Sequence, residues 1–526
     1  MLKLFKFMEP VNYSVKTLNW IFFSLLGISF FNKMLYVFNI PIPPTDYIAM
    51  EELGYNLLHG YGYESPKTGT GFNLLRSPLY PAILGFISLI TNDVFLWAKI
   101  FNSVVTTLIP LLLFVSLKDK VNIFVLFASS SVLLFHPHLF FLSGSALGEA
   151  VFSFLLCLLF LLSLKNTSLG FNETILSGFL IGLLYFARPE AVFLLLLYIV
   201  IIIFLKQSSL KKKILHAFLL VVFVLITVSP YIMFIKSKTG EFKISGKSNL
   251  VYSQSKSFVS DKYSWEETEK NKSTLFSDII SDPFMVVKIV SYHGARTLNF
   301  LLKENGAGYI FIIILLLLIL TKLTKEKPKI NIRFLATTVI FLLLIFVYFI
   351  FHAEERYLYS YSFLVICLIM SLFNSNSRTT DITAVLLLLV IPVFLLFNIK
   401  LTASHFNYDY IKDNYPVEHR DAGLWLKENH ILPASLRISS RKSFVIYYCD
   451  AWQVKLPSVD TKIPDIKRFF AENEVDYIIA DKRFMFQLRN NLKFLMSPKE
   501  AEKYGFISVK IFNEGKENEL IIYKIL

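Results

Sequence analysis

Long apolar runs alternate with short polar segments over the first 400 residues of the chain. A helix needs about 20 apolar residues to cross the ~30 Å hydrocarbon layer of a bilayer. Such runs begin near Leu18, Val94, Val121, Ser145, Glu173, Ala191, Lys213, Gly308, Ile332, Leu358 and Asp381, and the last ends near Lys400. The pattern predicts an all-α polytopic membrane domain over residues 1–400, with about eleven transmembrane helices.

Two regions depart from this pattern. The run Pro78–Ile90 is shorter and begins with two prolines, which is typical of an interfacial or re-entrant helix. After residue 400 the apolar runs shorten, and we predict a small α/β domain over residues 401–526. Its expected helices are His419–Asn429 and Ile466–Glu474, and its expected strands are Val475–Ala480, Phe506–Phe512 and Leu520–Ile525.

The lysines of the short loops lie on one side of the expected membrane. With the N-terminus inside, the inner loops hold Lys118, Lys120, Lys165, Lys206, Lys211–Lys213, Lys322–Lys329, Arg333 and Arg378. The short outer loops hold only Arg188 and Arg356, each beside glutamates, so every turn obeys the positive-inside rule. We therefore predict a multi-pass plasma (inner) membrane protein with a cytoplasmic N-terminus. Segments 39–77 and 236–307 become outer loops, and the C-terminal domain becomes extracytoplasmic.

Composition supports the bilayer as the solvent of this chain. The 526 residues are 55% hydrophobic and only 17% charged, less charge than a soluble protein of this length carries. The net charge of +14 could suggest nucleic acid, but the lysines cluster in loops between apolar runs, so no nucleic-acid partner is predicted. The three cysteines, Cys157, Cys367 and Cys449, give neither a disulfide framework nor a zinc-ligand spacing.

Asp46 follows the first apolar run by a few residues. A carboxylate at the membrane edge can act as a general base or bind a cation. It can equally cap the helix that begins there, with Thr45 as the alternative cap. Arg76 precedes the proline-opened helix, where a guanidinium could hold a lipid phosphate through bidentate hydrogen bonds. The alternative for Arg76 is an arginine that snorkels to the headgroups.

Further ionisable groups fall at the same, outer ends of the apolar runs. These are Glu149, the run Arg188-Pro189-Glu190, and the loop His352-Ala353-Glu354-Glu355-Arg356-Tyr357. Ionisable groups are costly at the border of hydrocarbon, and these alternate acids with arginines on one face. We infer a single polar outer cavity. His136 and His138 flank Pro137, where a helix-end pair is favoured over a metal pair.

Other chemistries lack their motifs in the sequence. It contains no P-loop, no glycine-rich dinucleotide fingerprint and no HExxH helix. Soluble nucleotide-sugar donors are found on the inner side of the membrane. A sugar transferase with an outer site would therefore use a lipid-linked donor.

The order of these motifs resembles the GT-C class of membrane glycosyltransferases, in the bacterial and archaeal family related to protein O-mannosyltransferases and the lipid A aminoarabinose transferase. The resemblance covers about residues 15 to 400. It is carried by Asp46-Tyr47, Asn56–Gly62, Arg76–Pro81, Gly178–Glu190, Lys238–Phe242 and Glu355–Leu358. The aminoarabinose branch has an acidic residue before the basic one, where this chain has Leu75, which disfavours a metal site of that kind and that sugar.

The resemblance implies a polyprenyl-phosphate sugar donor, an acceptor that is a lipid, glycan or protein, and inversion at the anomeric carbon. Asp46 would be the general base, and Arg76 and Arg356 would bind the donor phosphate. Tyr47, Tyr80, Glu149, Arg188, Glu190, His352, Glu355 and Tyr357 would line the substrate cavity. No cofactor is predicted, although a divalent metal stays compatible with the pattern.

Two other functions fit parts of the sequence. A transporter or flippase of lipid-linked saccharides also needs many spans and an outer arginine, but it would show polar residues at mid-membrane. A polysaccharide polymerase or ligase shares arginines in outer loops but does not predict the Asp46 region.

Overall fold

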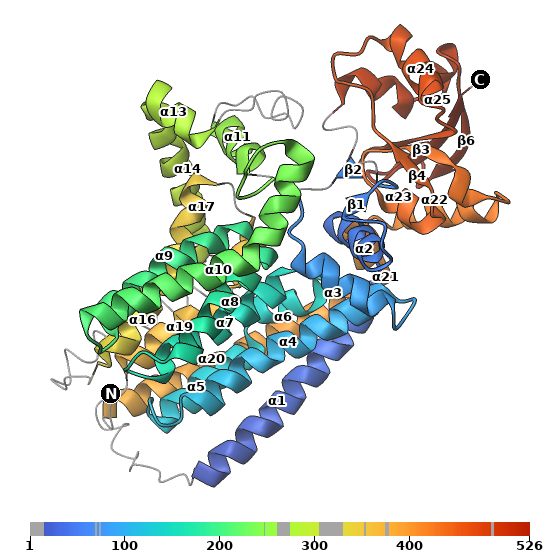
Figure 1. The fold of residues 1–526 in the computed structure, drawn as a ribbon. Helices are drawn as coiled ribbons and strands as arrows, with labels where there is room; N and C mark the ends of the chain where they lie inside the picture. Colours follow the sequence, from blue (N-terminus) through green and yellow to red (C-terminus); the bar gives the residue numbers. More distant parts are fainter. Residues whose placement is uncertain are drawn as a thin grey trace.

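The apolar segments form helices that lie side by side in one bundle, as the computed structural model of the chain shows (Figure 1). The structure describes residues 15–68, 71–72, 75–246, 248–259, 274–303, 330–351, 354–373, 378–484 and 489–525. The bundle contains α1 (Val15–Phe38), α4 (Val94–Ser116), α5 (Ile123–Phe135), α6 (Pro137–Gly144), α7 (Glu149–Lys165), α8 (Phe171–Ala187), α9 (Phe193–Val200) with the π-turn η3 (Ile201–Leu205), α10 (Leu210–Thr239), α16 (Ile332–Leu342), η4 (Leu343–Phe346), α17 (Val347–Ile350), α19 (Ser362–Leu372) and α20 (Arg378–Ser404). Helix is found at every predicted span within these ranges, while the span expected from Gly308 lies outside them.

Five helices of the described chain are long and apolar enough to cross a membrane. They are Val15–Phe38, Val94–Ser116, Leu210–Thr239, Ile332–Ile350 and Thr380–Ser404, and a sixth span results if α5 and α6, bent by 41°, count as one. The helices α7, α8 and α19 stand at predicted positions with only 17, 17 and 11 residues. The mostly helical membrane fold is therefore confirmed, and the number of eleven spans stays a prediction.

Further elements connect the bundle helices. The predicted helix at Pro78–Ile90 is α3 (Leu79–Ser88). The others are α2 (Thr45–Leu58), β1 (Glu64–Ser65), β2 (Gly71–Phe72), η2 (Pro189–Val192), α11 (Ser248–Val259), α13 (Leu275–Ser281), α14 (Pro283–Lys303) and α18 (Glu355–Tyr359). Figure 1 shows α2, β1, β2 and α11 toward the same end of the bundle. The two predicted outer loops thus meet at one end.

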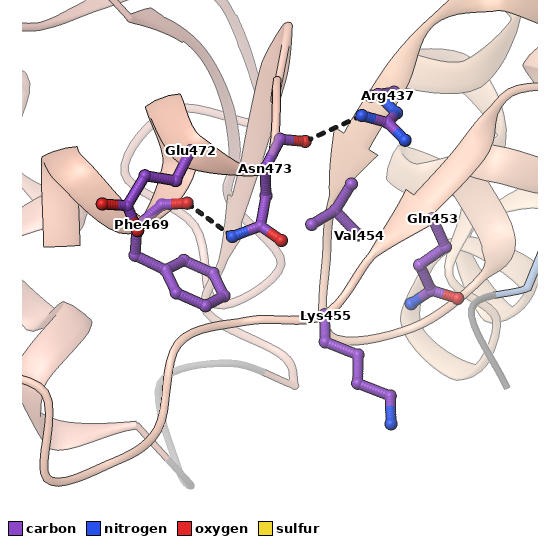
Figure 2. A pocket seen from close by; sticks show the side chains of 7 residues that line it. All are labelled: Arg437, Gln453, Val454, Lys455, Phe469, Glu472 and Asn473. Carbon is purple, nitrogen blue, oxygen red and sulfur yellow. Dashed lines mark hydrogen bonds between the residues drawn. The ribbon is translucent and has the colours of Figure 1, made fainter.

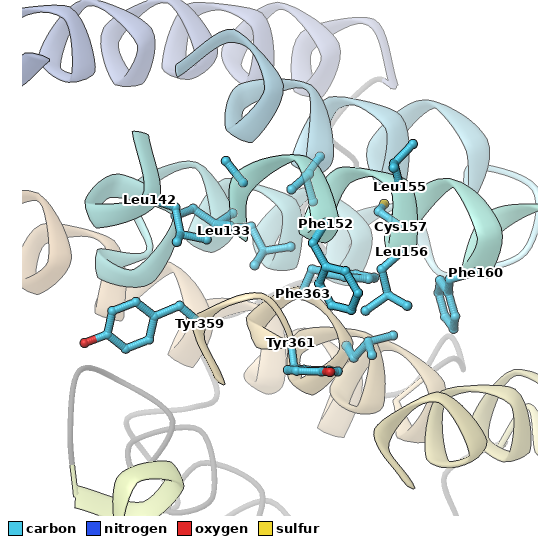
Figure 3. Close-up of a cluster of buried hydrophobic side chains, with 14 of the residues drawn as sticks. Leu133, Leu142, Phe152, Leu155, Leu156, Cys157, Phe160, Tyr359, Tyr361 and Phe363 are labelled. Carbon is cyan, nitrogen blue, oxygen red and sulfur yellow. The ribbon is translucent and has the colours of Figure 1, made fainter. Parts of the chain in front are cut away.

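The α7 helix lies at the centre of the bundle. Its side chains Phe152, Leu156 and Phe160 are fully buried and pack into the same cluster as Phe363 of α19 (Figure 3). A helix that is apolar on all sides needs neighbours on all sides. Because Glu149 begins α7, this packing fixes the position of the Glu149 carboxylate at the end of the bundle.

The end of α1 is fixed by a buried lysine of α4. The Lys99 ammonium donates to the carbonyl oxygens of Val37, at 2.7 Å, and of Ile40, at 2.9 Å. These carbonyls have no partner within α1 once the helix ends, and buried carbonyls need donors. Lys99 therefore sets where the chain leaves α1 and turns toward α2.

The C-terminal residues form a five-stranded mixed sheet with helices, in agreement with the predicted α/β character. The strand order is β4 (Trp452–Val454), β3 (Arg437–Ser439), β5 (Tyr477–Asp481), β7 (Leu520–Ile525), β6 (Phe506–Phe512); β3 runs parallel to β4 and β5, and the other pairs are antiparallel. The helices are α21 (Tyr408–Asn414), α22 (Val417–Glu428), α23 (Phe444–Cys449), α24 (Ile463–Glu472) and α25 (Pro498–Lys503), with 3-10 turns at Pro433–Ser435 and Asn490–Met496. The domain limits of 401 and 526 stay predictions.

Two close-packed glycines bring α2 against α3. A Cβ atom added to Gly54 would lie 2.1 Å from the Pro81 carbonyl oxygen, and one added to Gly85 would lie 2.3 Å from the Gly54 carbonyl oxygen. The two backbones therefore touch, and α2 carries Asp46 in its first turn.

We expect Gly54→Ala to lower the unfolding temperature of the purified protein, since the new methyl group forces α2 and α3 apart at a cost of about 1–3 kcal/mol. Thermal unfolding in detergent measures the effect. Gly27→Ala is the matched control, because a Cβ at Gly27 meets nothing within 4 Å. Equal unfolding temperatures for the two variants would contradict the close packing.

Candidate active site

Asp46 joins two arginines that come from distant parts of the chain. One carboxylate oxygen of Asp46 accepts a hydrogen bond from Arg76 Nη2 at 2.6 Å, and the other accepts one from Arg356 Nη2 at 2.7 Å. Asp46 lies in the first turn of α2, Arg76 lies just before α3, and Arg356 belongs to α18. The three side chains are 18–31% exposed, so they are partly buried yet accessible.

The arginines decide the protonation state of Asp46. Burial alone would raise the pKa of the Asp46 carboxyl, but the charges of Arg76 and Arg356 outweigh it and hold the pKa well below its usual range. Asp46 is therefore ionised at neutral pH, and its charge is already compensated. A carboxylate with such a low pKa is a weak base.

A second layer of ion pairs extends from Arg356. Its Nε lies 3.5 Å from a Glu149 oxygen and 2.7 Å from a Glu354 oxygen. The same Glu149 oxygen lies 3.6 Å from Arg188 Nη1, and Arg188 Nε lies 2.6 Å from Glu190 Oε1. Acids and arginines thus alternate along one continuous chain of charges. Such compensation is required for groups as buried as Arg188, whose side chain is 8% exposed.

Aromatic side chains hold the inner end of this chain of charges. The Arg188 guanidinium lies 3.7 Å from the centre of the Tyr357 ring, within cation–π distance. Tyr348 donates a hydrogen bond of 3.0 Å to the Glu190 oxygen that pairs with Arg188. Tyr348 was not predicted from the sequence, because a tyrosine within an apolar run carries no signal of its partner.

The structure brings seven of the predicted site residues together: Asp46, Arg76, Glu149, Arg188, Glu190, Arg356 and Tyr357. Glu355 begins α18 next to Arg356. Tyr80 is buried beside the Gly148 backbone, and Tyr47 is buried with its ring 5.1 Å from that of Phe95. These two tyrosines support the packing around the ion pairs. His352 lies outside the described residues.

No group of three or more His, Cys, Asp or Glu side chains in the described part of the chain is arranged to hold a metal ion. The His136–His138 pair lies at the break between α5 and α6, where His136 Nδ1 accepts a hydrogen bond from the His138 backbone and caps α6. Its role as a helix-end pair is confirmed.

A separate recess lies in the C-terminal domain (Figure 2). Its volume is about 470 Å³, and it is lined by Arg437, Gln453, Val454, Lys455, Phe469, Glu472 and Asn473. Arg437 donates to the Asn473 carbonyl oxygen and Asn473 donates to that of Phe469, so these polar groups are engaged within the recess. It contains none of the predicted site residues.

Glu51 of α2 lies between the bundle and the C-terminal domain. Burial raises the pKa of the Glu51 carboxyl to about 7, although the nearby hydroxyls of Tyr447 and Tyr47 favour its charged form. Among the described residues, nothing donates a hydrogen bond to its buried Oε2 atom. Tyr447 belongs to α23, so this carboxylate lies where the two parts of the chain meet.

Solved structures with the same fold exist, although neither a protein-family model nor a curated protein matches the sequence. ArnT from Cupriavidus metallidurans, bound to undecaprenyl phosphate, matches 96% of this chain and 98% of its own at a TM-score of 0.57 and 9% identity. The oligosaccharyltransferase AglB from Archaeoglobus fulgidus, in complex with an inhibitory peptide and a dolichol-phosphate, matches 89% of this chain and 70% of its own at a TM-score of 0.50 and 11% identity. The same enzyme with zinc and sulfate gives a TM-score of 0.52 at 13% identity, over 87% of this chain and 68% of its own. The chain therefore shares the GT-C fold that its motifs predict.

We expect Glu51→Gln to stabilise the protein most at alkaline pH. The folded protein retains the Glu51 proton at a higher pH than the unfolded chain does, so the wild type loses stability as the pH rises from about 4.5 to about 7. The amide has no proton to lose. The gain in unfolding temperature should therefore be small at about pH 5 and large at about pH 8.

Thermal unfolding of both proteins in the same detergent measures this gain. Glu500→Gln on α25 is the control, since Glu500 is exposed. A gain that is the same at both pH values would exclude titration of Glu51 as its cause.

Proposed function

We propose that the protein is a glycosyltransferase that moves a sugar from a polyprenyl-phosphate donor to a lipid, glycan or protein acceptor at the outer face of the plasma membrane. The observation that carries this proposal is the Asp46 carboxylate held between Arg76 and Arg356. The site combines a base with two phosphate-binding groups, as transfer from a sugar phosphate requires. The shared fold with ArnT bound to undecaprenyl phosphate and with AglB bound to a dolichol-phosphate supports the lipid-phosphate donor.

Arg76 and Arg356 bind the donor phosphate in this proposal. A guanidinium forms paired, charge-assisted hydrogen bonds with phosphate oxygens as readily as with a carboxylate. Both arginines present these donors to Asp46 in the structure. The incoming phosphate competes with Asp46 for these N–H donors. Their orientation is already set by the ion pairs with Asp46.

Asp46 gains basicity through this exchange. Its pKa lies well below the usual range because the two arginines outweigh its burial. When they turn to the phosphate, burial becomes the dominant influence and the pKa rises. The donor thereby activates the base that its own transfer needs, and a protein without donor keeps Asp46 neutralised.

The reaction then proceeds in one displacement. The acceptor oxygen forms a bond to the anomeric carbon from the face opposite the phosphate, and Asp46 takes the acceptor proton. The bond from the anomeric carbon to the phosphate oxygen breaks with its electron pair going to the phosphate, so the configuration is inverted. Positive charge develops on the sugar as in glycoside hydrolysis. General-base catalysis contributes about 10²–10⁴-fold, and each cation at the leaving phosphate contributes a few kcal/mol.

Glu149, Arg188, Glu190 and Tyr357 form the sugar and acceptor side of the site. Their main contribution is to hold Arg356, because Glu149 lies between Arg356 and Arg188. A guanidinium fixed on its Nε side keeps its Nη atoms aimed at the phosphate position.

The proposed orientation in the membrane, with the N-terminus inside, is supported by the lysines of the short inner loops.

Asp46→Asn should lower transfer by at least about 10²-fold, because the amide cannot accept the acceptor proton. The assay follows a radiolabelled sugar from its polyprenyl phosphate to acceptor and the release of free polyprenyl phosphate. Asp465→Asn, on the exposed surface of α24, is the matched control. Near-normal turnover by a folded Asp46→Asn variant would remove Asp46 from the mechanism.

Arg76→Gln should move the acid limb of the pH profile of kcat/KM to higher pH. Arg76 lowers the pKa of Asp46, so its removal lets burial raise that pKa, and the base is lost to protonation at a higher pH. Profiles between about pH 4 and pH 8 measure the shift, because the acid limb of wild type lies below this range and that of the variant should move toward it. An acid limb that stays in place while the rate falls would show that Arg76 acts only on the phosphate.

A further inference from the structure

The C-terminal domain docks directly onto the elements that carry the site. Phe444, at the start of α23, is buried in the same apolar cluster as the bundle helices, and Tyr447 packs against that cluster. Figure 1 shows α23 beside α2 and β1. The loop between β3 and α23, residues 440–443, therefore reaches the part of the molecule where α2 begins.

Polar contacts tie the C-terminal end of α23 and the strand β4 to the segment that follows α2. The Glu52 carboxylate accepts hydrogen bonds from the backbone of Lys67, at 2.7 Å, and of Thr68, at 3.1 Å. Lys67 in turn forms a 2.6 Å ion pair with Asp450, at the end of α23. The backbone nitrogen of Gln453 also donates to the Lys67 carbonyl oxygen. Both ends of α23 are thus fixed relative to α2.

Lys442 lies in the loop between β3 and α23, two residues before the buried Phe444. The residue is half-buried, its ammonium lies 5.7 Å from the centre of the Phe484 ring, and it interacts electrostatically with Arg441, Asp46, Glu354 and Arg76. Arg76, Arg188 and Arg356 each contact a carboxylate directly. Among the described residues, the Lys442 ammonium forms no hydrogen bond and no ion pair. It is a cation near the site that no carboxylate of the described residues contacts directly.

The proposed reaction creates a charge that needs such a cation. A polyprenyl-phosphate sugar is a phosphodiester with one negative charge. When the bond to the anomeric carbon breaks, the electron pair stays on the phosphate, and the released monoester carries up to two negative charges. Arg76 and Arg356 are enough to hold the diester, and the second charge arises only as transfer proceeds.

We propose that Lys442 of the C-terminal domain binds the second negative charge of the departing phosphate, so that the docked domain completes the site. This inference rests on the proposed function. It gives the C-terminal domain a part in the chemistry itself. A cation that meets charge formed only during bond breaking accelerates transfer more than it tightens donor binding.

The test compares two lipids that differ by one charge. Undecaprenyl phosphate is the monoester, doubly charged at about pH 8 because its second pKa is about 6. Its methyl ester is a diester with a single charge. We expect wild type to bind the monoester more tightly than the diester, and Lys442→Met to lose about tenfold in affinity for the monoester with little change for the diester.

Lys499→Met is the matched control, because Lys499 is an exposed lysine on α25 of the same domain. At about pH 5 the monoester carries one charge, and the difference between wild type and Lys442→Met should disappear. A Lys442→Met variant that keeps the wild-type ratio of the two affinities would overturn the inference. Wild type that binds neither lipid would instead refute the proposed function.

A second variant guards against misfolding of Lys442→Met. Lys442→Cys can be treated with 2-bromoethylamine, which restores an ammonium on a side chain of nearly lysine length, while the native Cys157, Cys367 and Cys449 are buried. We expect treatment to restore monoester affinity and to leave diester affinity unchanged. Modification at position 442 without this recovery would also overturn the inference.

Discussion

The double ion pair of Asp46 with Arg76 and Arg356 is the interaction on which the site depends. It joins side chains that are 30 and 310 residues apart in the chain. Each charge is partly removed from water, and a partly buried charge without a partner would destabilise the fold. The ion pairs of Asp46 with the two arginines therefore hold the three segments together. Both arginines thus hold Asp46 in this position.

The apolar part of the structure provides the rigidity that this interaction needs. Lys99 fixes the end of α1, and the contact of Gly54 with Gly85 fixes α2 against α3. Packing of α7 in the core fixes Glu149, which in turn holds Arg356. Charged groups that must meet within 3 Å are thus carried by elements whose positions are set by close packing. Preorganised charges of this kind stabilise charge that develops in a transition state.

Much of this arrangement could be predicted from the sequence. Long apolar runs locate the helices, and ionisable residues at their ends are rare enough to mark Asp46, Arg76, Glu149, Arg188 and Arg356. The lengths of the helices could not be predicted, because Pro137 and the turn at Ile201–Leu205 interrupt runs that are uniformly apolar. The hydrogen bond of Tyr348 to Glu190 and the position of Lys442 near the ion pairs were also missed. Each depends on contacts between distant segments, and neither a tyrosine in an apolar run nor a lysine in a polar tail differs from its neighbours by composition.

In the proposed reaction, the low pKa of Asp46 favours a particular order of events. A carboxylate that pairs with two arginines stays ionised at neutral pH and is a weak base. An uncharged acceptor, such as a sugar hydroxyl, cannot displace the arginines. A phosphate can, because it offers them the same paired oxygens with at least equal charge. In this mechanism donor binding therefore precedes activation of the acceptor. The same ion pair that stabilises the fold thus links the appearance of the base to the presence of the donor.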